Sequence, residues 1–346
     1  MHTFSNNRVC CISDIHIGVH RNSQTWHDIA LEWARWLVAE LHKDNVTDII
    51  ISGDFFHYRS EIAVNTLHIA SDILDIWKDF NIVILVGNHD AFFKNTSSVN
   101  SLSIISGRDH ITIIDEVTSI RFADKQITLC PWGTDIPQIP KSDIIFGHFS
   151  IETFNETLYK TCDHGLRASD LLSKADLVIT GHFHVRQQRD YKKGTILYLG
   201  NPYEMNFNDL DNIKGYYILD LITKKFDFYN NPISPLHKKV RLSDLAKQKK
   251  ITDNIRNTIY NNIIKLIIDR PISGQETDLL VNKLSQLRPL SINLDYEINF
   301  NAYQFIENEK CDLSNVDMEQ ALLDFISLLE IPESQKQDVE KYSLDI

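Results

Sequence analysis

Side chains that bind metal ions stand at the ends of five apolar segments of the sequence. They are Asp14 and His16 after 8–13, Asp54 after 48–52, Asn88 after 82–86, His148 after 143–147, and His182 and His184 after 176–180. Imidazole nitrogen mixed with carboxylate oxygen suits manganese, iron and zinc, whereas calcium prefers oxygen alone and structural zinc sites are rich in cysteine. Because seven such side chains are too many for one ion, the sequence predicts a centre for two ions that share a carboxylate.

The segments that precede these side chains are typical of buried strands. Strands at 8–13, 48–52 and 82–86 alternate with amphipathic helices at 23–42 and 61–79, which predicts a layered α/β domain. In such a domain the loops beyond the carboxyl ends of neighbouring strands meet at one edge of the sheet. Further strands are expected at 127–130, 143–147, 176–180, 195–199, 215–221 and 225–229, which a mixed sheet or two sheets packed face to face would accommodate.

The character of the sequence changes after residue 230. The segment 230–239 contains two prolines among polar residues and is the best candidate for a linker. Beyond it a strand within 262–272, a helix at 277–287 and an alternating strand at 291–300 predict a small α/β unit. An apolar stripe then predicts a C-terminal helix, with Met318, Leu322, Phe325, Ile326 and Leu329 on one face.

Composition narrows the class of protein. With 346 residues, 43% hydrophobic and 24% charged, the chain is expected to be globular, with one large domain and one or two smaller ones. The sequence shows neither an export signal nor an apolar run long enough to cross a bilayer, so we expect a cytoplasmic protein without membrane contact. Five scattered cysteines argue against a disulfide framework. The net charge of −12 means that a nucleic-acid partner requires a local basic surface, metal ions or another subunit.

The metal-binding blocks read "DIH", "GD", "GNHD", "GH" and "GHFH" in chain order. In this order they resemble the signature of the calcineurin-like metallophosphoesterase superfamily, and the resemblance implies an α/β fold with four layers, α/β/β/α. It also implies which residues hold each ion: Asp14, His16, Asp54 and His184 for the first, and Asp54, Asn88, His148 and His182 for the second. Asp54 would bridge two divalent ions, for which manganese is preferred over magnesium, iron or zinc.

Within the superfamily the sequence is most similar to the SbcD-type DNA repair nucleases and to the nuclease subunit of tailed-phage recombination complexes. The blocks that carry this similarity are "GDFFH" at 53–57, "LGNPYEMNFND" at 199–209 and "KGYYILD" at 214–220. The similarity implies a nuclease domain at 1–232, a DNA-capping α+β domain at 240–305 and a helical segment at 312–346 that binds an SbcC-type ATPase. A homodimer of the nuclease subunit is usual in that family and is expected here.

The resemblance also assigns the groups that act on the substrate. His89 follows the ligand Asn88 and is placed to donate a proton to the leaving 3′ oxygen of DNA. His57 would orient the phosphate or support His89, and Asp90 would brace the loop or His89. Two alternatives remain open: a metallophosphoesterase that acts on a small nucleotide or a phosphoprotein, and a chain that only scaffolds the ATPase.

Overall fold

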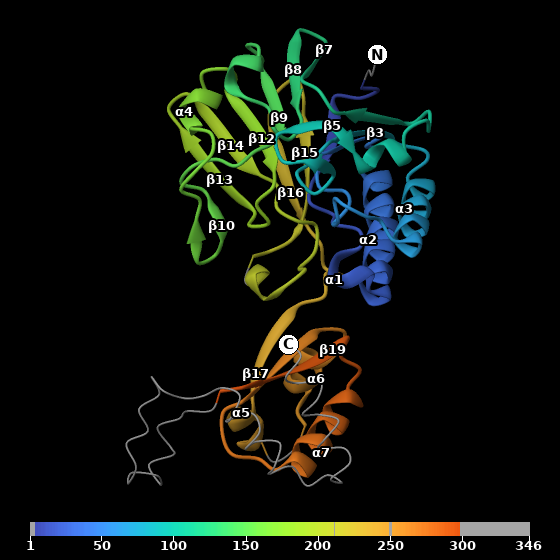
Figure 1. Cartoon of the computed structure of the whole chain (residues 1–346), viewed down its shortest axis with the longest axis vertical. Helices are drawn as coiled ribbons and strands as arrows, with labels where there is room; N and C mark the ends of the chain where they lie inside the picture. Colours follow the sequence, from blue (N-terminus) through green and yellow to red (C-terminus); the bar gives the residue numbers. More distant parts are fainter. Residues whose placement is uncertain (1–3, 211, 249–250, 298–346) are drawn as a thin grey trace, which may run out of the picture. The chain divides into compact units, whose positions relative to one another are not determined.

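Two mixed sheets form the larger part of the structure, a computed structural model that describes residues 4–210, 212–248 and 251–297 (Figure 1). The predicted ATPase-binding segment, 312–346, and the end of the predicted capping domain, 298–305, lie outside the described residues. No helix within the described ranges is both long enough and apolar enough to span a membrane.

The first sheet carries three of the predicted ligand loops. Its strand order is β16-β15-β1-β2-β3-β6, with bounds Arg8–Ile12 (β1), Asp48–Ile51 (β2), Asn81–Leu85 (β3), Ile111–Ile114 (β6), Gly215–Asp220 (β15) and Phe226–Asn230 (β16). Strands β1, β2, β3 and β6 are parallel, whereas β15 is antiparallel to β1 and to β16. The loops of Asp14, Asp54 and Asn88 therefore leave the sheet at the same edge.

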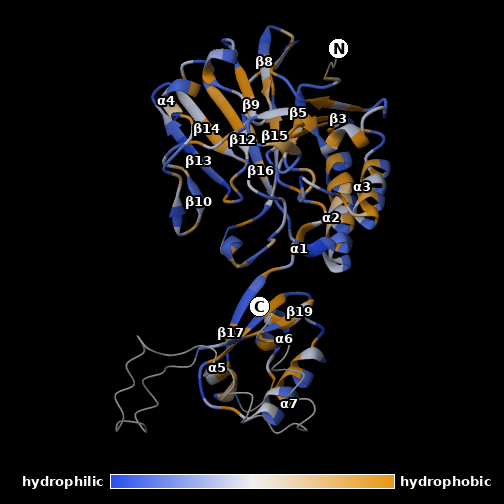
Figure 2. Ribbon diagram, viewed as in Figure 1, coloured by the Kyte–Doolittle hydropathy of each residue, from blue (hydrophilic) through white to orange (hydrophobic). Residues whose placement is uncertain are grey.

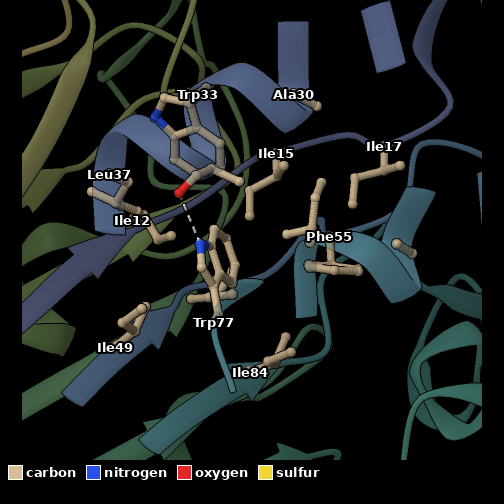
Figure 3. Packing of buried hydrophobic residues seen from close by; sticks show 14 of the residues in the cluster. Ile12, Ile15, Ile17, Ala30, Trp33, Leu37, Ile49, Phe55, Trp77 and Ile84 are labelled. Atoms are coloured by element: carbon tan, nitrogen blue, oxygen red, sulfur yellow. Dashed lines mark hydrogen bonds between the residues drawn. The ribbon is translucent and has the colours of Figure 1, made fainter. Parts of the chain in front are cut away.

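Helices α2 (Gln24–Lys43) and α3 (Val64–Ile76) pack on one face of this sheet, and the short α1 (Val19–Asn22) precedes them. Trp33 from α2 and Trp77, which ends α3, meet edge to face with ring centroids 5.7 Å apart (Figure 3). The Trp77 indole N–H donates to the carbonyl of Ala34 at 3.2 Å, so its polar atom is satisfied within the core. This packing fixes the sheet that carries the first ligand loops.

The second sheet packs on the other face of the first. Its order is β13-β14-β12-β9-β8-β7, with bounds Thr118–Phe122 (β7), Lys125–Cys130 (β8), Ile144–His148 (β9), Leu177–Gly181 (β12), Gln187–Tyr191 (β13) and Gly194–Tyr198 (β14). Alternation along β1 sends Val9 and Cys11 into a core shared with Phe146 and Ile179 of the second sheet, and Cys10 and Ile12 toward the helices. Figure 2 shows that central strands such as β9 and β12 are largely apolar, whereas the edge strand β13 is hydrophilic.

The outer face of the second sheet packs with α4 (Ala168–Leu171), which completes the layers. The structure thus confirms the expected α/β fold with two sheets between helical layers. Short elements join the main ones: the strands β4 (Ala91–Phe93), β5 (Thr96–Asn100), β10 (Asn155–Thr157) and β11 (Lys160–Thr161), and the 3-10 helices η1 (Ser101–Ile104), η2 (Ile136–Gln138) and η3 (Phe207–Asp209).

A smaller sheet follows, with three parallel strands in the order β17 (His237–Arg241), β18 (Ile263–Ile268) and β19 (Ser291–Tyr296). Helices α5 (Leu242–Ala246), α6 (Asp253–Ile259) and α7 (Gly274–Ser285) supply the rest of its core. The first strand was not expected from the sequence, because β17 begins inside the segment interpreted as a linker. Only 231–236 of that segment lies between strands.

Candidate metal centre

The loops after β1 and β2 are tied to each other by backbone hydrogen bonds. The amide of Asp14 donates to the carbonyl of Gly53 at 3.1 Å, and the amide of His16 donates to that of Asp54 at 3.0 Å. Asp14, His16 and Asp54 have φ values of 55°, 51° and 56°, and His182 has 92°. Residues other than glycine rarely adopt this left-handed region, and such strain concentrates at functional sites. The fold therefore holds these side chains in unusual directions.

The first group of predicted ligands contains Asp14, His16 and His184, whose candidate ligand atoms all lie within 4.8 Å of one another. Nε2 of His16 lies 2.9 Å from Nε2 of His184 and 4.0 Å from Oδ1 of Asp14. Asp14 and His16 are buried, and His184 is half-buried. Two imidazole nitrogens that face each other beside a carboxylate suit a divalent cation.

The second group contains Asp54, Asn88, His148 and His182. Oδ1 of Asn88 lies 2.9 Å from Nε2 of His148 and 2.7 Å from Nδ1 of His182. Oδ2 of Asp54 lies 3.4 Å from Nε2 of His148, and the same oxygen lies 3.6 Å from Nε2 of His16 in the first group. The structure thus brings all seven predicted ligands together, with one carboxylate oxygen between the two groups.

Hydrogen bonds to the protein orient these ligands. Nδ1 of His148 donates to the carbonyl of Ser52 at 2.6 Å, which leaves the lone pair of the neutral ring on Nε2, where the second group lies. Oδ1 of Asp54 accepts the amide of His89 at 2.8 Å, so that Oδ2 is left for the centre. These hydrogen bonds therefore fix the orientations of His148 and Asp54.

Asp90 braces the loop that carries Asn88. Its buried carboxylate accepts the amides of Phe56 at 2.9 Å, Gly87 at 3.0 Å and Phe55 at 3.3 Å. Burial, together with the charge of Asp54, raises the pKa of Asp90 to about 6 despite these donors. The expected support role of Asp90 in this loop therefore agrees with its contacts.

Burial and the crowding of charges shift the pKa values of the ligands in opposite directions. Burial raises the pKa of Asp14, while it lowers the pKa of His16 and, with the help of His148, that of His182 to about 3. For His148 burial is the largest single influence and lowers the pKa, but the charge and hydrogen bond of Asp54, the charge of Asp14 and the hydrogen bond to Ser52 together outweigh it and raise the pKa to about 9. A divalent cation would replace that proton, because metal ions bind neutral imidazole.

The two residues predicted to act on the substrate lie beside the first group. Nδ1 of His89 donates to the carbonyl of His57 at 2.6 Å, and the two rings are stacked with centroids 5.2 Å apart. The His89 ring lies edge to face with that of His16, at 4.7 Å between centroids. Burial, with His89 beside it, lowers the pKa of His57 to about 4, so His57 is neutral near pH 7.

Gly181 allows a close approach between its strand end and the loops after β1 and β2. A Cβ atom there would lie 1.9 Å from Oγ of Ser13, 2.5 Å from the carbonyl oxygen of Ser52 and 2.9 Å from Oδ2 of Asp14. Any side chain at this position would push apart the loops that carry Asp14 and His182. Glycine before the histidine is therefore a requirement of packing at this strand end.

Two features of the centre were missed by the sequence analysis. Trp132 follows β8, and its ring centroid lies 5.0 Å from that of His182 and 5.9 Å from that of His148. Lys214 is buried and donates to the carbonyl of His184 at 2.8 Å and to Oδ1 of Asp209 at 2.9 Å. Trp132 stands at a strand end, like the ligands, and that position was the available signal. Asp209 and Lys214 lie in two of the blocks that carry the family similarity, but those blocks did not indicate that the two side chains pair in the core.

The fold and the grouped ligands are those of a metal-dependent phosphoesterase. The calcineurin-like phosphoesterase family matches residues 7–186, more than half of the chain. The chain therefore belongs to this family, and it is a metal-dependent phosphodiesterase. The family resemblance expected from the sequence is confirmed, and the described His and Asp groups are suited to the divalent metals that such enzymes use.

Among known proteins, the chain is 26% identical to exonuclease subunit 1 of enterobacteria phage T4 over 236 residues, which cover 65% of this chain and 68% of that protein. This relative agrees with the expected similarity to phage nuclease subunits. Among solved structures, an archaeal phosphodiesterase is 17% identical, with a TM-score of 0.35 over 65% of this chain and 99% of the other. A Vps29 variant from Entamoeba histolytica is 14% identical, with a TM-score of 0.31 over 65% and 99%.

Proposed function

We propose that the chain is a DNA nuclease with two metal ions, which hydrolyses phosphodiester bonds as an exonuclease and also as an endonuclease. The position of Asp54 carries this proposal, because its Oδ2 lies 3.6 Å from a nitrogen of His16 and 3.4 Å from one of His148. Enzymes that cleave phosphodiesters with two ions hold them about 3.5–4 Å apart on such a shared carboxylate. The phage exonuclease subunit among the relatives supports DNA as the substrate.

The proposed ligand sets follow the two groups. Asp14, His16 and His184 hold one ion together with Asp54, and Asn88, His148 and His182 hold the other with the same carboxylate. Manganese is our proposal for the metal because the donors mix imidazole with oxygen and include no thiolate. When bound, the ions supply a hydroxide near neutral pH and neutralise charge on the phosphate.

His89 is the proposed general acid. Because its Nδ1 donates to the carbonyl of His57, the second proton of the charged ring is carried on Nε2, from which it is delivered to the leaving 3′ oxygen. The carbonyl of His57 also stabilises the positive ring by accepting its other N–H at 2.6 Å. The neutral His57 ring stacks on His89 and keeps it beside the first group.

The nuclease is proposed to work within a complex. Residues 1–232 would form the nuclease domain, 240–305 the part that caps the DNA, and 312–346 the segment that binds an SbcC-type ATPase, with two nuclease subunits in the assembly. Support for a partner comes from the relative, which is named as a subunit. Retention of the ATPase by a chain cut after residue 311, in a tagged co-expression experiment, would contradict this assignment.

The test of the activity uses linear duplex DNA and the purified chain, stripped of metal and then supplied with manganese. We expect shortening of the DNA only with the metal, and its loss in Asn88→Ala. Methyl 4-nitrophenyl phosphate, a small phosphodiester, serves as the second substrate. Intact DNA beside rapid cleavage of the small ester would refute the nuclease function and favour a small nucleotide substrate.

A further inference from the structure

A cavity of about 500 Å³ opens beside the second ligand group. Its walls include Lys94, Trp132, Asp135, His148, Phe149 and His164. This volume lies in the range of sites that bind small molecules, roughly 300–1,000 Å³. Because His148 is both a proposed ligand and part of the wall, a phosphate at the metal centre would have one of its substituents beside the cavity.

Trp132 gives this cavity a rigid aromatic wall. Its amide donates to the carbonyl of Val86 at 2.8 Å, and its indole N–H donates to the carbonyl of Lys94 at 2.8 Å. The first bond ties the tryptophan to the end of β3, the strand that leads to Asn88. A ring held at both its backbone and its indole nitrogen loses little freedom when a ligand stacks on it.

We propose that this cavity binds the nucleoside attached to the scissile phosphate, with its base stacked on Trp132. This inference rests on the proposed nuclease function and adds a subsite to it. An aromatic face accepts every base, because each base has a π-face, so stacking on Trp132 would not require a particular base. Lys94, which is exposed at the rim, adds a positive charge near the phosphate backbone.

The position of the cavity also predicts which side of the cleaved bond lies in it. The cavity adjoins His148 in the second group, whereas His89 adjoins His16 and His57 near the first. A phosphate between the groups would thus direct its leaving 3′ oxygen toward His89 and its retained nucleoside toward Trp132. The released product would then be a nucleotide that keeps its phosphate on the 5′ oxygen.

A purely structural role for Trp132 makes a different prediction. Its ring packs against those of His182 and His148, and removal of that support would impair the centre for every substrate alike. A stacking role instead affects only substrates that carry a base. Two esters with the same leaving group separate these roles, namely thymidine 5′-(4-nitrophenyl phosphate) and methyl 4-nitrophenyl phosphate.

The experiment measures kcat/KM for both esters with the full chain and manganese. We expect the wild type to prefer the thymidine ester, and Trp132→Ala to reduce the ratio of the two values by about 5- to 150-fold, which is the effect of one stacked base. Trp132→Phe keeps an aromatic face and should retain most of the ratio. Since each variant acts as its own reference, a general loss of folded or active enzyme cancels.

Three results would overturn the subsite. They are a wild type without preference for the thymidine ester, an unchanged ratio in Trp132→Ala, and an equal loss in Trp132→Phe and Trp132→Ala. The nuclease function is judged separately, by cleavage of duplex DNA by the wild type. If DNA is cleaved but the ratio of the two kcat/KM values is unchanged in Trp132→Ala, the subsite is refuted and the nuclease function stands. If DNA stays intact but the ratios change as expected, the nucleoside site stands and the nuclease function is refuted.

Discussion

Replacement of Lys214 by methionine should destabilise the protein far more than the loss of an ordinary ion pair. The side chains of Lys214 and Asp209 are only 1% and 2% exposed, and their charged atoms lie 2.9 Å apart. Methionine fills similar space but leaves the carboxylate of Asp209 buried without its cation. Breaking a buried pair in this way costs about 3–5 kcal/mol of unfolding free energy.

The other contacts of Asp209 should keep its carboxylate buried after Lys214 is replaced. Its Oδ2 accepts the amide of Met205 at 2.9 Å and the side-chain amide of Asn201 at 3.2 Å, so the carboxylate is held in place without Lys214. The other oxygen, Oδ1, is the one that loses its donor. Lys214 also donates to the carbonyl of His184, so the variant should bind metal less tightly as well.

A pair with much greater exposure in the same protein provides the control. Lys224 lies 2.6 Å from Asp176, but their side chains are 24% and 57% exposed. Lys224→Met should therefore cost less than about 1 kcal/mol. Urea unfolding of both variants at pH 7 measures the difference in unfolding free energy. The double variant Lys214→Met with Asp209→Asn should recover part of the stability lost in Lys214→Met, because no buried charge is left. Equal costs for the two lysine variants would refute the reasoning.

The pH dependence gives the same prediction a second check. Burial would raise the pKa of Asp209, but the ammonium of Lys214, together with His184 and the amide of Met205, outweighs burial and holds this pKa below its ordinary value. The stability that Asp209 contributes is thus present above an unfolded pKa of about 3.9 and is lost as the pH falls through the lower folded pKa. In Lys214→Met the pKa of Asp209 in the folded state should rise. The stability deficit of the variant relative to wild type should therefore become smaller as the pH falls.

Three further predictions concern the metal centre. His89→Gln should reduce kcat on DNA by at least about 100-fold while the count of bound manganese ions is unchanged, and loss of metal would show that His89 is a ligand. Manganese at about 100 times its Kd should stabilise the metal-stripped protein by about 2.7 kcal/mol for each ion bound, measured in a thermal melt, and Asp54→Asn should remove most of this gain. Gly181→Ala should lower both stability and metal affinity, because the new Cβ would lie 1.9 Å from Oγ of Ser13. Gly274→Ala is the control: its Cβ would meet nothing within 4 Å, so stability should change by less than about 1 kcal/mol.

The strands that lead to the ligands were predictable because each is a short apolar run buried on both faces. Strands β1, β2, β3, β9 and β12 lie within a residue or two of the runs read from the sequence. Strand β17 was not predicted because its sequence, "HKKVR", has a single apolar residue and follows a segment rich in proline. Its pairing is also with β18, more than twenty residues further along the chain. Such pairing depends on a distant partner, which no local pattern reveals.

The ligands of the centre were predictable because metal chemistry restricts residue types, and strand ends restrict their positions. Trp132 stands at a strand end too, but an aromatic residue has an ordinary place in any core, so its type carried no signal. Lys214 and Asp209 lie five positions apart in a polar stretch that reads as a loop. Only the folded chain shows that the side chains of Asp209 and Lys214 are buried and that Lys214 contacts the carbonyl of His184.

The proposed centre also accounts for how an acidic chain can attract a polyanion. The net charge of −12 opposes binding of DNA at long range. Among the seven grouped ligands at the centre, however, only Asp14 and Asp54 are carboxylates. The other ligands bind an ion as neutral groups. Two buried carboxylates offset only half of the charge of two divalent cations, so the loaded centre is locally positive. Binding of DNA by this chain alone should therefore depend on metal more steeply than on basic side chains, and removal of metal should abolish binding as well as cleavage.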